Sequence, residues 1–146
     1  MTIALPDVNV LLALGMRDHV HHADASRWFF GNSVNRWATC PFTECGFVRI
    51  ASNPRLLPNG GLLDSVFSTL NMLRTRTGHE FWPADLSPAT EPLMHRVRGH
   101  NQITDAYLLA IAVHRNAQVV TFDRGLFAFA NMAGVAANVQ LLTSEG

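Results

Sequence analysis

The sequence predicts a single α/β domain over residues 1–146, and three observations lead to this prediction. The chain has the usual length of one domain, and 48% of its residues are hydrophobic, which is enough to form one core. Short apolar or β-branched segments alternate with segments of helical spacing. No internal repeat, low-complexity tract or long linker divides the sequence. Strands that alternate with helices are typical of a parallel sheet covered by helices on both faces.

The first half of the chain is expected to form two strands and three helices. Residues 3–5 are apolar and end close to Asp7, and Pro6 limits this strand because proline cannot donate a ladder hydrogen bond. Pro41 suits a first helical position, where its missing amide proton costs nothing, and it places Glu44 in the first turns of a helix. The set expected here is a strand at 3–5, helices at 10–16 and 21–30, a strand at 36–39 and a helix at 41–51.

The second half is expected to complete the sheet. Thr104 is a favourable N-cap, so we expect a helix from there through Val113, with Asp105 in its first turn beside the positive end of the helix dipole. A β-branched strand at 118–122 then delivers Asp123 at its carboxyl end. The other expected elements are a loop at 53–61 that contains Pro54, Pro58, Gly60 and Gly61, a helix at 63–73, a strand at 80–82, a helix at 88–97 and a strand at 139–142.

Four acidic residues occupy equivalent positions in this order of elements. Asp7 and Asp123 each follow a strand, whereas Glu44 and Asp105 each lie near the start of a helix. Ligands of parallel sheets gather at the carboxyl ends of the strands. If the first and fourth strands are neighbours, the four carboxylates converge on one pocket, where they would repel one another without a cation. Taken singly, each acid is more typical of a helix cap or a solvated turn.

A divalent cation would resolve this repulsion. Mg²⁺ prefers carboxylate and water oxygens, and it can generate an attacking hydroxide and neutralise the phosphate oxygens of an in-line displacement. Mn²⁺ accepts the same ligands, so the sequence does not distinguish the two metals. The four acids therefore favour a site at which a bound cation acts on a phosphodiester.

Four segments of the chain resemble the signature blocks of one family. They are LPDVNVLLAL, TECGFVRI, QITDAYLLAIAV and VVTFDRGL, and in this order they are similar to the PIN-domain ribonucleases, especially the VapC toxins of bacterial toxin–antitoxin pairs. The resemblance implies a three-layer fold with a parallel sheet of four or five strands between helices. It also implies a magnesium-dependent endoribonuclease that is a homodimer and is silenced by a VapB-like antitoxin lying across the active-site groove.

The resemblance also implies roles for individual residues. Asp7, Asp105 and Asp123 would be metal ligands, and Glu44 would be either a ligand or the group that orients the attacking water. The polar residues that would support the first and last acids are Asn9 and Thr121. Val8 departs from the family pattern, which often has a small hydroxyl residue after the first aspartate. This change leaves the ligands intact and affects only a supporting hydrogen bond.

Composition excludes several other functions. The formal net charge is zero and every basic residue is arginine. A phosphoryl-accepting receiver domain resembles this pattern of aspartates but needs a lysine, which the chain lacks. The sequence has no GxxxxGK, GxGxxG or GxSxG motif. Cys40 and Cys45 lie five residues apart, a spacing that fits reduced thiols in a cytoplasmic protein, and no segment resembles a signal peptide or a membrane span.

Other residues remain open to two interpretations. Three histidines in the segment 19–22 are typical of a solvated helix start rather than of a transition-metal site. The aromatic residues 28–30 cannot share one helical face, which favours core or dimer contacts over a base-stacking platform. Arg49, Arg55 and Arg124 lie near the expected acids or the adjoining loop, and they are either phosphate contacts or ordinary solvated arginines. A rival function is a catalytically silent PIN-like module that binds RNA or a partner without cutting.

Overall fold

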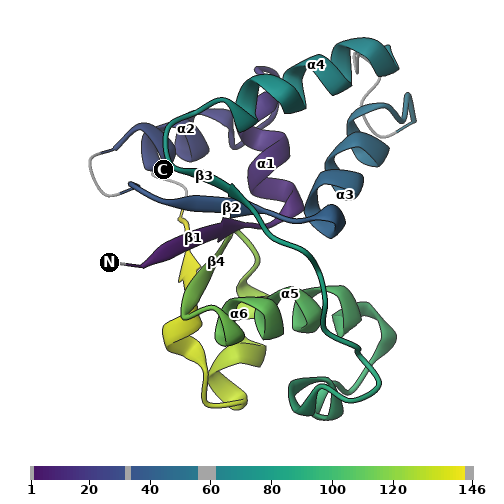
Figure 1. Cartoon of the computed structure of the whole chain (residues 1–146), viewed down its shortest axis with the longest axis vertical. Coiled ribbons are helices and arrows are strands. Elements are labelled where there is room, and N and C mark those ends of the chain that lie inside the picture. Colours follow the sequence, from purple (N-terminus) through teal and green to yellow (C-terminus); the bar gives the residue numbers. More distant parts are fainter. Residues whose placement is uncertain (1, 32–33, 56–61, 144–146) are drawn as a thin grey trace.

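A five-stranded parallel sheet forms the centre of the protein, as predicted (Figure 1). The structure is a computed structural model that describes residues 2–31, 34–55 and 62–143. Its strand order is β3-β2-β1-β4-β5. The strands are β1 (Ile3–Pro6), β2 (Trp37–Thr39), β3 (His79–Phe81), β4 (Ala117–Thr121) and β5 (Val139–Leu141).

Helices cover both faces of the sheet, which gives the three layers expected from the sequence (Figure 1). The α-helices are α1 (Val8–Gly15), α2 (His22–Phe30), α3 (Pro41–Ala51), α4 (Leu63–Arg74), α5 (Ile103–His114) and α6 (Arg124–Met132). The short 3₁₀ helices are η1 (Pro92–Arg96), η2 (His100–Gln102) and η3 (Ala136–Asn138). The helices α1 to α4 lie on one face, and α5 and α6 lie on the other.

The central strands are buried on both faces. Leu5 and Val119 belong to the core that packs against α5 and α6, whereas Ala4 and Val120 belong to the core formed with α1, α2 and α3. Consecutive side chains of a strand point to opposite faces, so a strand between two helical layers must be largely apolar. This explains the apolar character of both strands in the sequence, with the half-buried Gln118 and the buried Thr121 as the polar residues of β4.

Two expectations about the helices need correction, and one helix was not expected. The helix α5 begins at Ile103 rather than after Thr104, because the 3₁₀ turn η2 leads directly into it and its N-cap is Gln102. The helix expected at 88–97 is only the short η1, since Pro88 and Pro92 lack the amide protons that an α-helix needs there. Helix α6 is not predicted, although Asp123 is its N-cap.

The remaining boundaries lie within about two residues of those expected. In the loop predicted at 53–61, Pro58, Gly60 and Gly61 lie outside the described residues. Across the described ranges, the longest helices have 12 residues, and none is long and apolar enough to cross a bilayer.

Gly78 allows the chain to enter β3 close to β2. It has a φ of 86°, its carbonyl accepts a hydrogen bond from the Trp37 amide at 3.0 Å, and an added Cβ would lie 2.1 Å from the Asn35 carbonyl oxygen. We therefore expect Gly78→Ala to lower the free energy of unfolding by more than about 2 kcal/mol, measured by urea denaturation.

Gly134 provides a matched control for this prediction. Its φ is 79°, but nothing lies within 4 Å of an added Cβ. Gly134→Ala should therefore cost only the left-handed backbone conformation, about 1 kcal/mol. Equal effects of the two substitutions would show that the close approach of Gly78 to Asn35 is not important.

Candidate functional site

Asp7 is fixed at the carboxyl end of β1. Its backbone amide donates to the Val120 carbonyl at 2.9 Å, which continues the pairing of β1 with β4. Its Oδ1 accepts a hydrogen bond from the Val10 amide at 2.9 Å, so Asp7 is the N-cap of α1. The side chain is buried, with 7% of its surface exposed. A buried strand end and a helix start therefore hold this carboxylate in one orientation.

Thr121 connects Asp7 to the end of the neighbouring strand β4. The Thr121 hydroxyl donates to Asp7 Oδ2 at 2.5 Å and accepts from the Asp123 amide at 2.9 Å. Asp123 Oδ1 in turn accepts from the amides of Gly125 and Leu126, at 2.7 and 3.3 Å, and caps α6. The condition on which the convergence of the acids depended, that the first and fourth strands are neighbours, is met, and the buried Thr121 links the two acids at their ends.

Asp105 lies in the first turn of α5 and lines two cavities. The larger cavity, of about 990 Å³, also includes Asp7 and Asn9 and lies between α3 and α5. The smaller one, of about 210 Å³, also includes Asp123 and Gln102. Asp105 therefore stands between the other two aspartates.

The three aspartates also influence one another electrostatically. Burial raises the pKa of Asp7 to about 6, although the hydrogen bonds from Thr121 and Val10 oppose this change, and the charges of Asp105 and Asp123 raise the pKa further. Burial and the charge of Asp123 also raise the pKa of Asp105. Like charges that share a partly buried site need a counter-charge.

The structure does not bring Glu44 to this group. Its Oε2 accepts a hydrogen bond from the Thr39 hydroxyl at 2.5 Å and lies 3.5 Å from Arg74 Nε. The same Thr39 hydroxyl is 2.8 Å from His79 Nε2. Glu44 lines neither of the two cavities described above. The four acids therefore do not line one pocket: Asp7 and Asp105 share the larger cavity, Asp105 and Asp123 share the smaller one, and Glu44 lies outside both.

The opposite side of α3 faces the larger cavity. It contributes Phe42, Cys45, Gly46 and Arg49, while Phe47 points into the core. The helical spacing of Glu44 and Phe47, from which the sequence predicts the site, marks the side of α3 that faces away from the cavity. The spacing of Phe42, Cys45 and Arg49 is the signal that identifies the cavity wall.

The arginine, histidine and aromatic residues whose roles the sequence leaves open lie in different parts of the structure. Arg49 lines the larger cavity, whereas Arg55 and Arg124 are exposed and line neither cavity. His22 lies at the start of α2, and His21 stacks on Phe122 at 4.3 Å. Among the aromatic residues 28–30, Phe29 is buried and Phe30 is 62% exposed.

Across the described ranges, no three histidine, cysteine or acidic side chains are placed so as to hold a metal ion by themselves. This applies to the histidines of 19–22 as well as to the aspartates. Any cation at the aspartates would therefore take part of its coordination from water or substrate.

Comparison with known proteins identifies the class of this protein. The PIN domain family model matches residues 4–134, so the chain belongs to the PIN-domain family. The chain is 43% identical over 128 residues to Ribonuclease VapC38 of Mycobacterium tuberculosis (strain ATCC 25618 / H37Rv), a match that covers 88% of this chain and 90% of that protein. It is 42% identical over 125 residues to Ribonuclease VapC39 of the same strain, covering 84% and 90%.

A solved structure supports the fold. The crystal structure of Mycobacterium tuberculosis VapC20, described as a Sarcin-Ricin loop cleaving toxin, aligns with a TM-score of 0.65 and covers 86% of this chain and 93% of that chain. The sequence identity of this pair is 16%, so the likeness concerns the fold alone. The resemblance to PIN-domain and VapC proteins predicted from the sequence is confirmed.

Proposed function

We propose that this protein is a divalent-cation-dependent endoribonuclease, the toxin of a toxin–antitoxin pair. Relatives named as VapC ribonucleases, at 37% to 43% identity over most of the chain, support the nuclease and toxin assignments. The observation that carries the site is the arrangement of Asp7, Asp105 and Asp123. Asp7 and Asp123 lie at the ends of β1 and β4, and Asp105 lies at the start of α5. The pKa values of Asp7 and Asp105 are raised, and the charge of Asp123 contributes to both shifts.

The aspartates fit Mg²⁺ or Mn²⁺. Mg²⁺ is usually bound by one or two carboxylates and keeps several waters, so it does not require three ready-placed protein ligands. The carboxylates of Asp105 and Asp123 share the smaller cavity, and Asp7 shares the larger cavity with Asp105. A bound cation would supply the nucleophilic hydroxide and offset the charge of the phosphate oxygens.

The protein's own groups orient these acids. The Thr121 hydroxyl donates a hydrogen bond to the Asp7 carboxylate and accepts one from the Asp123 amide, so both acids are held by one buried hydroxyl group. Asn9 lines the cavity beside Asp7 and is exposed, where its amide can bind a phosphate oxygen or a water molecule. We assign both residues to the support of the reacting groups.

We do not place Glu44 among the metal ligands, because its carboxylate already contacts Thr39 and Arg74. We expect Asp105→Asn to weaken Mn²⁺ binding at least about 10-fold, measured by titration calorimetry. Glu44→Gln should leave the Mn²⁺ dissociation constant unchanged. An equal loss of affinity in both variants would place Glu44 among the ligands.

RNA cleavage tests the proposed function directly. Purified protein with Mg²⁺ should cleave total RNA, and both excess chelator and the Asp105→Asn substitution should prevent cleavage. The alternative function, a catalytically silent module that binds RNA or a partner, predicts no cleavage of any RNA by the wild-type protein.

The proposed partners follow from the toxin assignment. We propose that RNA is the substrate, that a VapB-like antitoxin silences the enzyme, and that two copies form a homodimer. The cytoplasm is the proposed location, and the free thiols of Cys40 and Cys45 are compatible with a reducing compartment.

A further inference from the structure

The histidines of the segment 19–22 make specific contacts and are half-buried rather than fully solvated. His22 Nδ1 donates to the Ala13 carbonyl at 2.7 Å, which ties the start of α2 to α1. The His21 amide donates to His19 Nδ1 at 3.0 Å. Neither a metal site nor a solvated helix start requires these contacts, so the segment has a structural role that the sequence did not indicate.

His19 fixes the backbone of His21. A histidine Nδ1 can accept a hydrogen bond only when it carries no proton. Burial lowers the pKa of His19, and the charges of His21 and His22 lower it further, so the neutral ring persists at pH 7. The His21 carbonyl in turn accepts from the Ala25 amide at 2.9 Å, and His21 is the N-cap residue of α2. The ring of His21 therefore starts from a backbone that is held on both sides.

The ring of His21 stacks on Phe122. The two ring centroids are 4.3 Å apart and the ring planes differ by 17°, which is a face-to-face contact. His21 Nδ1 also lies 3.8 Å from Asp24 Oδ2. Phe122 is half-buried and packs against the core formed with α1, α2 and α3. The Phe122 ring therefore has two supports, this core and the imidazole of His21.

Phe122 is the link between the two polar groups at the end of β4. It belongs to neither β4 nor α6, and it joins Thr121 directly to Asp123. The Thr121 carbonyl accepts from the Leu142 amide at 2.7 Å, and the Thr121 hydroxyl accepts from the Asp123 amide. Because the chain turns here from a strand into a helix, the packing of the Phe122 side chain helps to set the direction in which Asp123 leaves the sheet.

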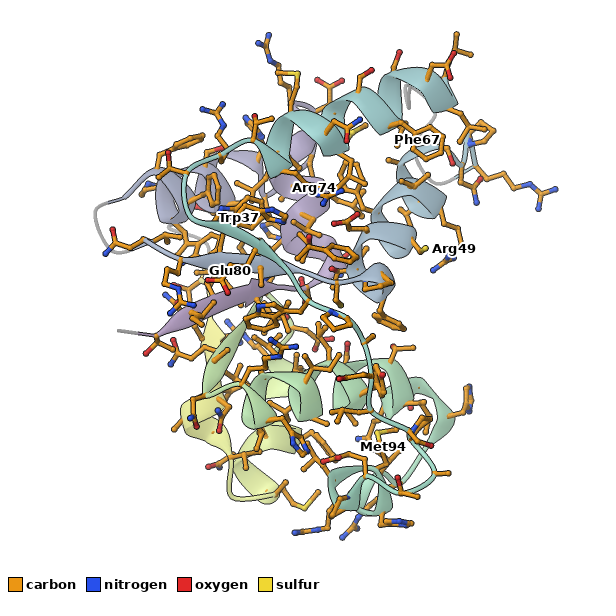
Figure 2. All side chains as sticks on the ribbon, viewed as in Figure 1. Trp37, Arg49, Phe67, Arg74, Glu80 and Met94 are labelled. Atoms are coloured by element: carbon orange, nitrogen blue, oxygen red, sulfur yellow. The ribbon has the colours of Figure 1, made fainter. Side chains whose placement is uncertain are left out.

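Helix α2 is a fixed support for this contact. Its residue Phe29 is buried and packs edge-on against Trp37 of β2, with the ring centroids 5.1 Å apart. Figure 2 shows Trp37 on β2, beside α2. The hydrogen bond from His22 holds the other end of the helix to α1. A ring at the start of such an anchored helix can restrain the segment against which it stacks.

We propose that His21 is a positioning residue for Asp123. By stacking on Phe122, it holds the turn from β4 to α6 so that the Asp123 carboxylate stays in the smaller cavity, which it shares with Asp105. His21 acts through Phe122 and contacts neither the cation nor the substrate. The proposal rests on the proposed function, because it takes Asp123 to be part of the cation site.

Two substitutions of His21 separate the aromatic face from the imidazole nitrogens. His21→Ala removes the stack and should raise the Mn²⁺ dissociation constant about 10-fold, measured by titration calorimetry. His21→Phe keeps a ring on Phe122 and should bind Mn²⁺ as tightly as the wild-type protein does. The matched control is Phe30→Ala, which removes a different aromatic contact of α2, that with Phe29 at 5.2 Å, and should leave Mn²⁺ binding unchanged.

Amide hydrogen exchange in the presence of chelator measures the same effect without metal. The Asp123 and Gly125 amides donate to Thr121 Oγ1 and to Asp123 Oδ1, so their exchange reports on this turn. His21→Ala should accelerate the exchange of both amides about 10-fold and leave the amides within α5 unchanged. Phe122→Leu removes the stack from its other side and should give the same result, which keeps the proposal testable if His21→Ala does not fold.

Several results would overturn the proposal. Unchanged Mn²⁺ affinity and unchanged exchange in His21→Ala would do so, and so would equal losses in His21→Phe and His21→Ala. Equal acceleration of the α5 amides would show that His21 stabilises the whole fold rather than this turn. Mn²⁺ binding and RNA cleavage by the wild-type protein distinguish the two levels. If both are present and His21→Ala matches the wild type, only the positioning role is rejected, whereas their absence rejects the proposed function.

Discussion

Asp7→Asn is expected to abolish metal-dependent RNA cleavage and also to stabilise the metal-free protein at neutral pH. The loss of a carboxylate that helps to hold the cation should reduce cleavage by more than about 100-fold, since loss of a group that merely orients a ligand costs about 10- to 100-fold. The gain in stability arises because burial raises the pKa of Asp7 in the folded protein to about 6, from an ordinary value of 3.8.

The sign of this pH dependence follows from the direction of the shift. The folded protein binds the Asp7 proton more tightly than the unfolded chain does. The resulting stabilisation is fully present below about pH 4 and is lost as the pH rises through about 6. The total change is about 3 kcal/mol, and the raised pKa of Asp105 acts in the same direction.

Urea denaturation in the presence of chelator, at pH 4.5 and pH 7.5, measures this effect. The wild-type protein should lose more stability between these pH values than Asp7→Asn does, and the variant should be the more stable of the two at pH 7.5. Asp64→Asn serves as the control, because Asp64 is exposed on α4. A less stable Asp7→Asn variant at pH 7.5 would contradict the electrostatic account.

Thr121→Val is expected to have the second largest effect. Valine keeps the shape of the fully buried threonine but removes the hydroxyl that donates to Asp7 and accepts from the Asp123 amide. Leaving those buried groups without this partner should cost about 1 to 3 kcal/mol of unfolding free energy. Cleavage should fall about 10- to 100-fold, because neither aspartate is then held in its orientation.

Thr121→Ser separates the role of the hydroxyl from that of the fold. Serine keeps the donor and acceptor but loses a methyl group, so it should lose some stability and retain most of the activity. Initial rates of RNA cleavage and urea denaturation of both variants give the two readouts. Activity that survives in Thr121→Val would show that this hydroxyl is not important for the site.

The central sheet was predictable from local sequence. The runs at Ile3–Pro6 and Ala117–Thr121 are largely apolar because both faces of these strands are covered, and an aspartate lies just beyond each run. The positions of Asp7 and Asp123 follow from this local pattern, and that of Asp105 follows from the helical pattern after Thr104. Their convergence depends on the pairing of β1 with β4, which the sequence left open as a condition.

Features that depend on distant partners were not predictable in the same way. Glu44 lies in the expected helix, but its orientation is set by Arg74 on α4 and by Thr39 at the end of β2. Helix α5 begins before Thr104 because a 3₁₀ turn precedes it, and the residues of that turn carry no clear cap. The sequence did contain a signal for α6, since Leu126, Phe129 and Ala130 have helical spacing after the N-cap Asp123.

We propose that Asp7, Asp105 and Asp123 together bind a divalent cation. Locating Mn²⁺ by anomalous diffraction from crystals of the wild-type protein tests it most directly. We predict a peak at the carboxyl ends of β1 and β4, within coordination distance of at least one of these aspartates, that is absent in Asp105→Asn. A Mn²⁺ peak confined to the histidines of 19–22 or to Glu44, with none at the aspartates, would contradict the claim.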